Sequence, residues 1–148
     1  MISIETILVP VDFSTHSERA LEMAIGLART FGAKVHLLHA YHLNISVAAP
    51  DGIIVPQTLR DTVRDSAASK LEKSAQRVTL EGIQAETHLT ADTPSAAIEQ
   101  TARQIQADLV VMGTRGLTGL KHVFLGSVAE TTVRTAPCPV MTVKSEEG

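Results

Sequence analysis

The chain has 148 residues, of which 44% are hydrophobic and 20% charged, with a formal net charge of −3. These values predict one globular domain, residues 1–148, and exclude a disordered chain, while the negative charge argues against a general nucleic-acid binder. Cys138 is the only cysteine, so an internal disulfide and a cysteine zinc site are excluded, and a reducing, cytoplasmic location is expected. The apolar runs are too short for a membrane span, and the first residues lack the pattern of a signal peptide.

The first third of the chain predicts a strand, a helix and a second strand. Residues 6–11 are an apolar run rich in β-branched side chains, which indicates a buried strand. The sequence Thr15-His16-Ser17-Glu18 has the form of a capping box, so the Thr15 hydroxyl is expected to cap a helix that ends at Gly32. Residues 34–40 predict the second strand. The irregular stretch 41–56 that follows is unusually long for a connection and is typical of a functional loop.

The remaining sequence continues this alternation. Residues 57–81 predict the longest helix, because apolar side chains recur at every fourth position, and 83–89 predict a third strand. Pro94 opens the next helix at its first position. Residues 108–112 and 140–144 predict the fourth and fifth strands. Strands that alternate with helices indicate a mostly parallel sheet with helices on both faces, a doubly wound α/β sandwich of three layers.

The most informative segment is the glycine-rich loop GTRGLTGLKHVFLGS, residues 113–127, which directly follows the fourth strand. In open α/β sheets ligands bind beyond the carboxyl ends of strands where the winding reverses, and the first strand also ends in polar residues. Glycines allow backbone N–H groups to approach an anion, Arg115 offers a fork of donors, and the capping box Ser127-Val128-Ala129-Glu130 opens a helix whose N-terminus favours phosphate. The pattern is neither GxGxxG nor a Walker P-loop, and an ordinary surface loop before a capped helix is the alternative interpretation.

The glycine spacing resembles a known nucleotide-binding signature. Gly113, Gly116 and Gly126-Ser127, with two and then nine residues between the glycines, resemble the signature of the universal stress protein family. The blocks ILVPVDFS, KVHLLHA, ADLVVMGTRG and APCPVMTVK resemble that family in order and spacing. The resemblance implies a five-stranded parallel sheet of order 3-2-1-4-5, usually a homodimer, and bound ATP in members that carry this signature.

The resemblance also implies roles for individual positions. The Val11 backbone would read adenine, Ala40 would pack on it, and Asp12 would hold the ribose or the polyphosphate, in the latter case through Mg²⁺. ADP or AMP is an alternative to ATP. Ala40 is smaller than the branched residue often found there, which leaves the purine selectivity open. The implied nucleotide-binding positions are Pro10, Val11, Asp12, Ala40, Met112, Gly113, Arg115, Gly116, Gly126, Ser127 and Val128.

Three side chains have a structural interpretation beside a functional one. An Asp that follows a strand often caps the next turn, so Asp12 can have this role instead of binding a ligand. His36 and His39 are expected to share one face of the second strand, where core or rim histidines are favoured over a metal pair because no third ligand is visible. Cys138 is interpreted as a small buried hydrophobe.

The favoured function is a nucleotide-dependent regulatory module of a stress response, with no catalytic residues and at most slow hydrolysis, because no general base accompanies Asp12. The alternatives are a weak ATPase or nucleotidyl transferase, a phosphoacceptor domain using Asp12, Asp92 and Lys144, and a ligand-free scaffold. The fifth strand, 140–144, is expected at a sheet edge, where pairing with a second copy would form a homodimer. The stretch 41–56 is the second choice for that interface.

Overall fold

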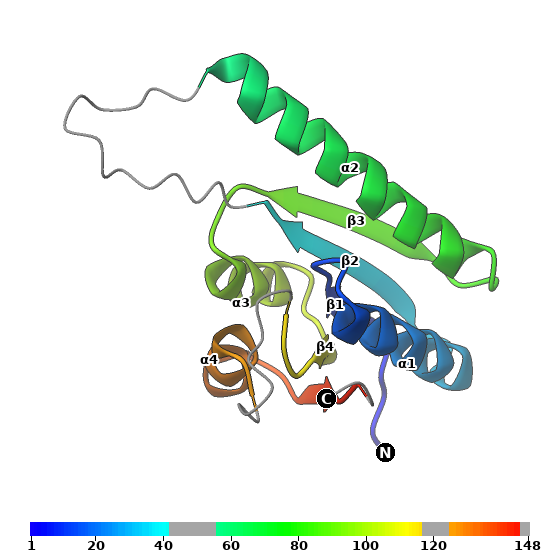
Figure 1. The fold of residues 1–148 in the computed structure, drawn as a ribbon. Coiled ribbons are helices and arrows are strands. Elements are labelled where there is room, and N and C mark those ends of the chain that lie inside the picture. The colour runs from blue at the N-terminus through cyan, green and yellow to red at the C-terminus, as the bar shows by residue number, and fades with distance from the viewer. Residues whose placement is uncertain (42–55, 117–124, 146–148) are drawn as a thin grey trace.

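The computed structural model describes residues 1–41, 56–116 and 125–145. Helices and strands alternate along these residues, as the sequence predicts (Figure 1). In chain order the elements are β1 (Thr6–Pro10), α1 (Thr15–Phe31), β2 (Lys34–Ala40), α2 (Gln57–Thr79), β3 (Ala85–Thr90), α3 (Pro94–Gln104), β4 (Leu109–Gly113), α4 (Ser127–Thr135) and β5 (Val140–Val143).

The five strands form one sheet in the order β3-β2-β1-β4-β5, and every pair of neighbours is parallel. The predicted fold class and strand order are therefore confirmed. The chain winds outward from β1 to β3 and then returns to add β4 and β5 on the other side of β1. The winding thus reverses between β1 and β4, which is where open α/β sheets bind ligands.

Two apolar clusters separate the sheet from its helices, one on each face. α1 and α2 contribute to the first cluster, and α3 and α4 to the second. β1 serves both clusters, because Ile7 and Val9 face the first and Leu8 faces the second, all of them fully buried. Burial on both faces explains why this strand is an unbroken apolar run rather than an alternating one.

The helix starts differ from the sequence prediction by one residue. Ser14, not Thr15, is the N-cap of α1, and its Oγ accepts a hydrogen bond from the Ser17 N–H at 3.2 Å. Gly126 is the N-cap of α4, so Ser127 is the first helical residue and does not cap the helix. In both cases the capping-box pattern located the turn, but the position of the cap depends on where the preceding loop leaves the sheet.

Two further details complete the fold. The third strand begins at Ala85 rather than at position 83, because Ile83 is buried in the first cluster without joining the strand. Most of the irregular stretch 41–56, namely 42–55, lies outside the described residues. Within the ranges that are described, no helix has the length and apolar character needed to cross a membrane.

Candidate functional site

The ends of β1 and β4 lie side by side, because Ile7 pairs with Leu109 and Leu8 with Val110. The two polar segments that follow these strands therefore meet at one edge of the sheet. A Cβ placed on Gly116 would lie only 2.6 Å from Oδ2 of Asp12. The carboxylate of the first loop thus contacts the glycine of the second, as expected if both loops border one site.

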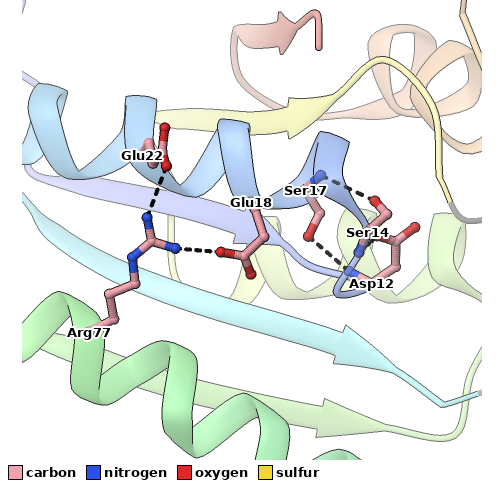
Figure 2. Close-up of polar contacts among 6 residues, drawn as sticks. All are labelled: Asp12, Ser14, Ser17, Glu18, Glu22 and Arg77. Atoms are coloured by element: carbon pink, nitrogen blue, oxygen red, sulfur yellow. Dashed lines mark hydrogen bonds and ion pairs between the residues drawn. The ribbon is translucent and has the colours of Figure 1, made fainter. Parts of the chain in front are cut away.

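A network of hydrogen bonds holds the turn that contains Asp12, and Figure 2 shows its residues. Asp12 Oδ1 accepts a hydrogen bond from the Ser14 N–H at 3.0 Å, and the Asp12 N–H donates to Ser17 Oγ at 3.3 Å. The interpretation of Asp12 as a turn-capping residue is therefore confirmed. Since Oδ1 serves the turn while Oδ2 faces Gly116, the two interpretations of this side chain are compatible.

The next residue, Phe13, adopts a left-handed backbone conformation with φ of 66°. For a bulky side chain this conformation costs about 1–3 kcal/mol and persists only where the surroundings enforce it. The Phe13 ring packs against His39, with 4.6 Å between ring centroids, and Lys70 Nζ lies 5.7 Å from the ring centroid. These contacts hold a strained turn in place, and such turns are common at binding sites.

Val11 is 5% exposed, and its side chain belongs to the first apolar cluster, so only its backbone is available to a ligand. Its N–H donates to the Leu38 carbonyl at 2.8 Å, and its carbonyl accepts a hydrogen bond from His39 Nδ1 at 2.7 Å. A carbonyl oxygen has two lone pairs. The Val11 carbonyl therefore retains the capacity to accept a second hydrogen bond.

The two ends of the glycine-rich loop are close together. The Gly126 N–H donates to the Thr114 carbonyl at 2.7 Å, and a Cβ on Gly126 would lie 3.5 Å from Arg115 Cα. The N-terminus of α4 thus lies beside the segment that follows β4. Its first-turn N–H groups have no partners within a helix and favour an anion. Residues 117–124 of the loop, including Lys121 and His122, lie outside the described residues.

Gly113 allows a close approach between β4 and α1. A Cβ at this position would lie 2.8 Å from Cβ of His16 and 2.9 Å from the backbone C and O of the same residue. The first turn of α1 therefore packs directly on the end of β4. This contact fixes the Asp12 turn relative to the glycine-rich loop.

An ion-pair cluster connects α1 to α2 close to the same turn. Arg77 of α2 pairs with Glu18 and, at 3.2 Å, with Glu22 of α1 (Figure 2). All three side chains are at least 40% exposed, so the cluster stabilises the fold only modestly. It lies beside the candidate site without forming part of it.

The expectation that His36 and His39 share one face of the second strand is wrong. His36 and His39 do not share a face, because side chains three apart on a strand point to opposite faces. His39 contacts the Val11 carbonyl, whereas His36 contacts His88 on β3. Within the described residues, no group of three His, Cys, Asp or Glu side chains is arranged to hold a metal ion.

Cys138 is half-buried and packs against the second apolar cluster. Burial, followed by the nearby Asp108 carboxylate, raises the pKa of its thiol. A thiol with a raised pKa forms little thiolate and is a poor nucleophile. Cys138 therefore fits the structural role predicted from the sequence.

The predicted positions group at one edge of the sheet, and three residues that support them, Ser14, Ser17 and His39, were not predicted. Pro10, Ala40, Met112 and Val128 lie at or beside the carboxyl ends of β1, β2 and β4 or in the first turn of α4, with the other predicted positions nearby. Ser14 and Ser17 hold the Asp12 turn, and their spacing of three is a capping signal displaced by one residue. The role of His39 has no sequence signal, because it depends on the pairing of β1 with β2.

The sequence and fold match known proteins along nearly their whole length. A profile of the universal stress protein family matches residues 3–144. A universal stress protein from Methanocaldococcus jannaschii is 34% identical over 141 residues, which cover 93% of this chain and 81% of the relative. Among solved structures, the protein MJ0577 superposes with a TM-score of 0.86 at 26% identity, covering 99% of this chain and 100% of the other.

Two further solved structures contain adenine nucleotides. The universal stress protein from Archaeoglobus fulgidus in complex with dAMP is 26% identical, with a TM-score of 0.67, and covers 97% of this chain and 100% of its own. A protein from Arabidopsis thaliana with AMP bound is also 26% identical, with a TM-score of 0.70. The match covers 97% of this chain and 93% of the Arabidopsis chain. The match to the family profile, residues 3–144, spans all the residues that form the candidate site.

Proposed function

The chain belongs to the universal stress protein family, and from this premise we propose that it binds ATP at the carboxyl ends of β1 and β4 and acts as a nucleotide-dependent regulatory module. One observation carries the proposal. The Asp12 carboxylate contacts Gly116, close to the N-terminus of α4, at the edge where the sheet reverses its winding. The solved complexes of related proteins with AMP and dAMP support an adenine nucleotide.

The site residues divide between the two halves of such a ligand. The second lone pair of the Val11 carbonyl is suited to accept a hydrogen bond from the adenine amino group. Pro10, Ala40 and Met112 supply apolar contacts around the base and the ribose. Arg115, Gly116, Gly126, Ser127 and Val128 are assigned to the phosphates, with Ser127 free of any capping role in α4.

Magnesium enters this proposal only through the nucleotide. Mg²⁺ is commonly held by one or two carboxylates together with substrate phosphates, so the single Asp12 carboxylate fits this role. Asp12 Oδ2, which faces Gly116, is the oxygen that would contact the ion. When bound, the ion would neutralise phosphate charge next to Asp12.

Titration calorimetry with ATP, ADP, AMP and GTP tests the proposal, in parallel with mass spectrometry of small molecules released by denaturing the purified protein. Heat from the adenine nucleotides and little from GTP is expected, because the 6-oxo group of guanine cannot donate to the Val11 carbonyl. No heat from any nucleotide, with no released ligand, would instead indicate the ligand-free scaffold.

We expect bound ATP to be turned over very slowly. Phosphate contacts position a nucleotide but do not activate water, and Asp12 already accepts a hydrogen bond from the Ser14 N–H. Phosphate release well below about 1 s⁻¹, the lower end of ordinary enzyme rates, is the expected result. Release at or above that rate, abolished by Asp12→Asn, would identify an ATPase instead.

A homodimer through β5 is part of the proposal. β5 is the outer strand next to β4, and its four residues are only partly buried. The carbonyls of Pro139 and Val143 accept hydrogen bonds from β4 and the residue after it. The backbone N–H and C=O groups of successive residues point in opposite directions along a strand. Those of Val140 and Thr142 therefore point away from β4. An unpaired edge of this kind is suited to antiparallel pairing with a second copy.

Thr142→Pro is expected to convert the dimer to a monomer, because it removes an N–H that faces the open edge and leaves the bonds to β4 intact. Light scattering should change from twice the chain mass to the 15.8 kDa of one chain. Thr142→Ala retains the N–H and serves as the matched control, with its dimer intact. A wild-type mass equal to one chain would contradict the dimer. A Thr142→Pro variant that remains a dimer would contradict pairing through β5 and leave 41–56 as the next candidate interface.

We further propose that the module acts in the cytoplasm, where its only thiol, Cys138, would remain reduced. Nucleotide binding would change the surface presented to a partner protein.

A further inference from the structure

Three ionisable side chains form a line across β2 and β3, away from the candidate nucleotide site. His36 lies opposite Glu86 in the strand register, and His88 lies two residues further along β3. His36 Nδ1 is 2.8 Å from His88 Nε2, and His36 Nε2 is 3.1 Å from Glu86 Oε2. The His36 side chain is only 4% exposed, whereas that of Glu86 is 56% exposed.

The two imidazole rings meet edge to edge rather than face to face. Their planes differ by 17°, and their centroids are 5.1 Å apart. Stacked rings cannot approach closer than a van der Waals contact of about 3.5 Å, but the two nitrogens are 2.8 Å apart. The contact is therefore an N–H···N hydrogen bond that lies close to both ring planes.

Such a bond limits how many protons the pair can carry. One of the two facing nitrogens must donate a hydrogen and the other must accept it through a free lone pair. In the neutral pair, His88 Nε2–H can donate to His36 Nδ1 while His36 Nε2–H faces Glu86. The Nε2 atom is at ion-pair distance from Glu86 but is not aligned for a hydrogen bond, so this buried group is incompletely satisfied.

A first added proton can be placed on the pair without breaking the bond, because a ring nitrogen outside the bond can carry it. A second proton has to be placed on His36 Nδ1, where two N–H groups would face each other at 2.8 Å. The hydrogen bond cannot survive that step. Full protonation therefore breaks the side-chain connection between β2 and β3.

We propose that His36, His88 and Glu86 form a proton-binding site that couples the docking of the edge strand β3 to pH. β3 lies at the end of the sheet, and α2 covers it on the opposite face through Ala85 and Leu89. Loss of the histidine bond therefore loosens β3 and α2 together. The proposal is independent of nucleotide binding.

The charges around His36 agree with this sequence of events. Burial lowers the pKa of His36 from its ordinary 6.5; Glu86 opposes the shift, while His88 and Lys34 add to it. On α3, which packs against β2, the Glu99 carboxylate pairs with Arg103 at 3.3 Å. Since the unfolded chain binds this proton more readily than the folded one, stability falls as pH drops below about 6.5, and the decrease stops once the folded site is protonated.

Hydrogen exchange of the β3 amides at pH 7.5 and pH 5.0, corrected for the intrinsic chemical rate, tests the proposal. The wild-type protein is expected to lose at least about tenfold protection in β3 at pH 5.0 relative to pH 7.5. His88→Gln retains a hydrogen-bond donor to His36, but glutamine does not gain a proton in this pH range. The loss of β3 protection between pH 7.5 and pH 5.0, expressed as a logarithm, should therefore be at most half as large in this variant as in the wild type. Equal loss in wild type and His88→Gln would overturn the proposal.

Glu86→Gln provides a second variant at a half-exposed position, where misfolding is not expected. Because the carboxylate raises the pKa of His36, its removal should move the midpoint of the transition to lower pH. A midpoint that stays the same or rises would contradict the assigned role of Glu86. Imidazole ¹⁵N spectra at pH 7.5 add an independent readout. His36 is expected to carry its hydrogen on Nε2, and a hydrogen on Nδ1 would contradict the arrangement in which His88 donates to His36.

Discussion

Gly113→Ala is expected to lower the free energy of unfolding by about 1–3 kcal/mol, the range typical of an overpacked core. The added Cβ would lie 2.8 Å from Cβ of His16 and 2.9 Å from that residue's backbone C and O. The backbone of α1 cannot move aside as the end of a flexible side chain can, so β4 and α1 must separate. Urea denaturation with linear extrapolation measures the change.

Gly26→Ala is the matched control for this prediction. It makes the same chemical change on α1, but a Cβ at Gly26 would meet nothing within 4 Å. Alanine is favoured over glycine inside a helix by about 0.5–1 kcal/mol, so this variant should be more stable than wild type. A Gly113→Ala variant as stable as Gly26→Ala would show that α1 does not pack on β4 as closely as described.

Gly116→Val is expected to leave the fold intact and to reduce ATP affinity at least about 100-fold. The new Cβ would lie 2.6 Å from Asp12 Oδ2, and the other close atom, Asp12 Cγ, is 3.8 Å away. Both belong to a side chain that can rotate, so the cost to stability is limited to the Asp12–Ser14 hydrogen bond, about 0.5–1.5 kcal/mol. The carboxylate, however, must leave its position, and the valine carbons occupy space assigned to phosphate. A factor of 100 corresponds to about 2.8 kcal/mol, within reach of a lost charge-assisted contact and a steric clash together.

Calorimetry with ATP measures this loss, and circular dichroism with thermal unfolding verifies the fold. Gly26→Ala should bind ATP as wild type does, since it lies outside the site. A double-mutant cycle of Gly116→Ala with Asp12→Ala tests the cause, because the two losses should not add if both act through the same carboxylate. Unchanged affinity in Gly116→Val would place the phosphates elsewhere on the protein.

Much of the fold could be predicted because its signals are local. The apolar run of β1 indicated burial on both faces, and Leu8 and Val9 on neighbouring positions indeed enter different clusters. The order of strands was implied by the family resemblance and is confirmed. The cap of α1 was misplaced by one residue, because Thr15 and Ser14 offer the same hydroxyl and only the path of the loop selects between them.

The candidate site was predictable in composition but not in geometry. The glycine spacing from Gly113 to Gly126 identified the loop, and the position of Asp12 after β1 identified its partner. The sequence could not reveal that Asp12 Oδ2 contacts Gly116, or that Gly113 accommodates the first turn of α1. These contacts join segments about a hundred residues apart.

The sequence by itself determined the order of strands and helices, which faces are apolar, and where a glycine-rich segment precedes a helix N-terminus. Only the tertiary structure decided which polar groups contact each other. The histidines show the reason: His36 and His39 are near in sequence yet lie on opposite faces, while His36 and His88 form a hydrogen bond. Local periodicity specifies the face on which a side chain lies, but its neighbour on the next strand is set by strand order and register, which arise only when the whole sheet assembles.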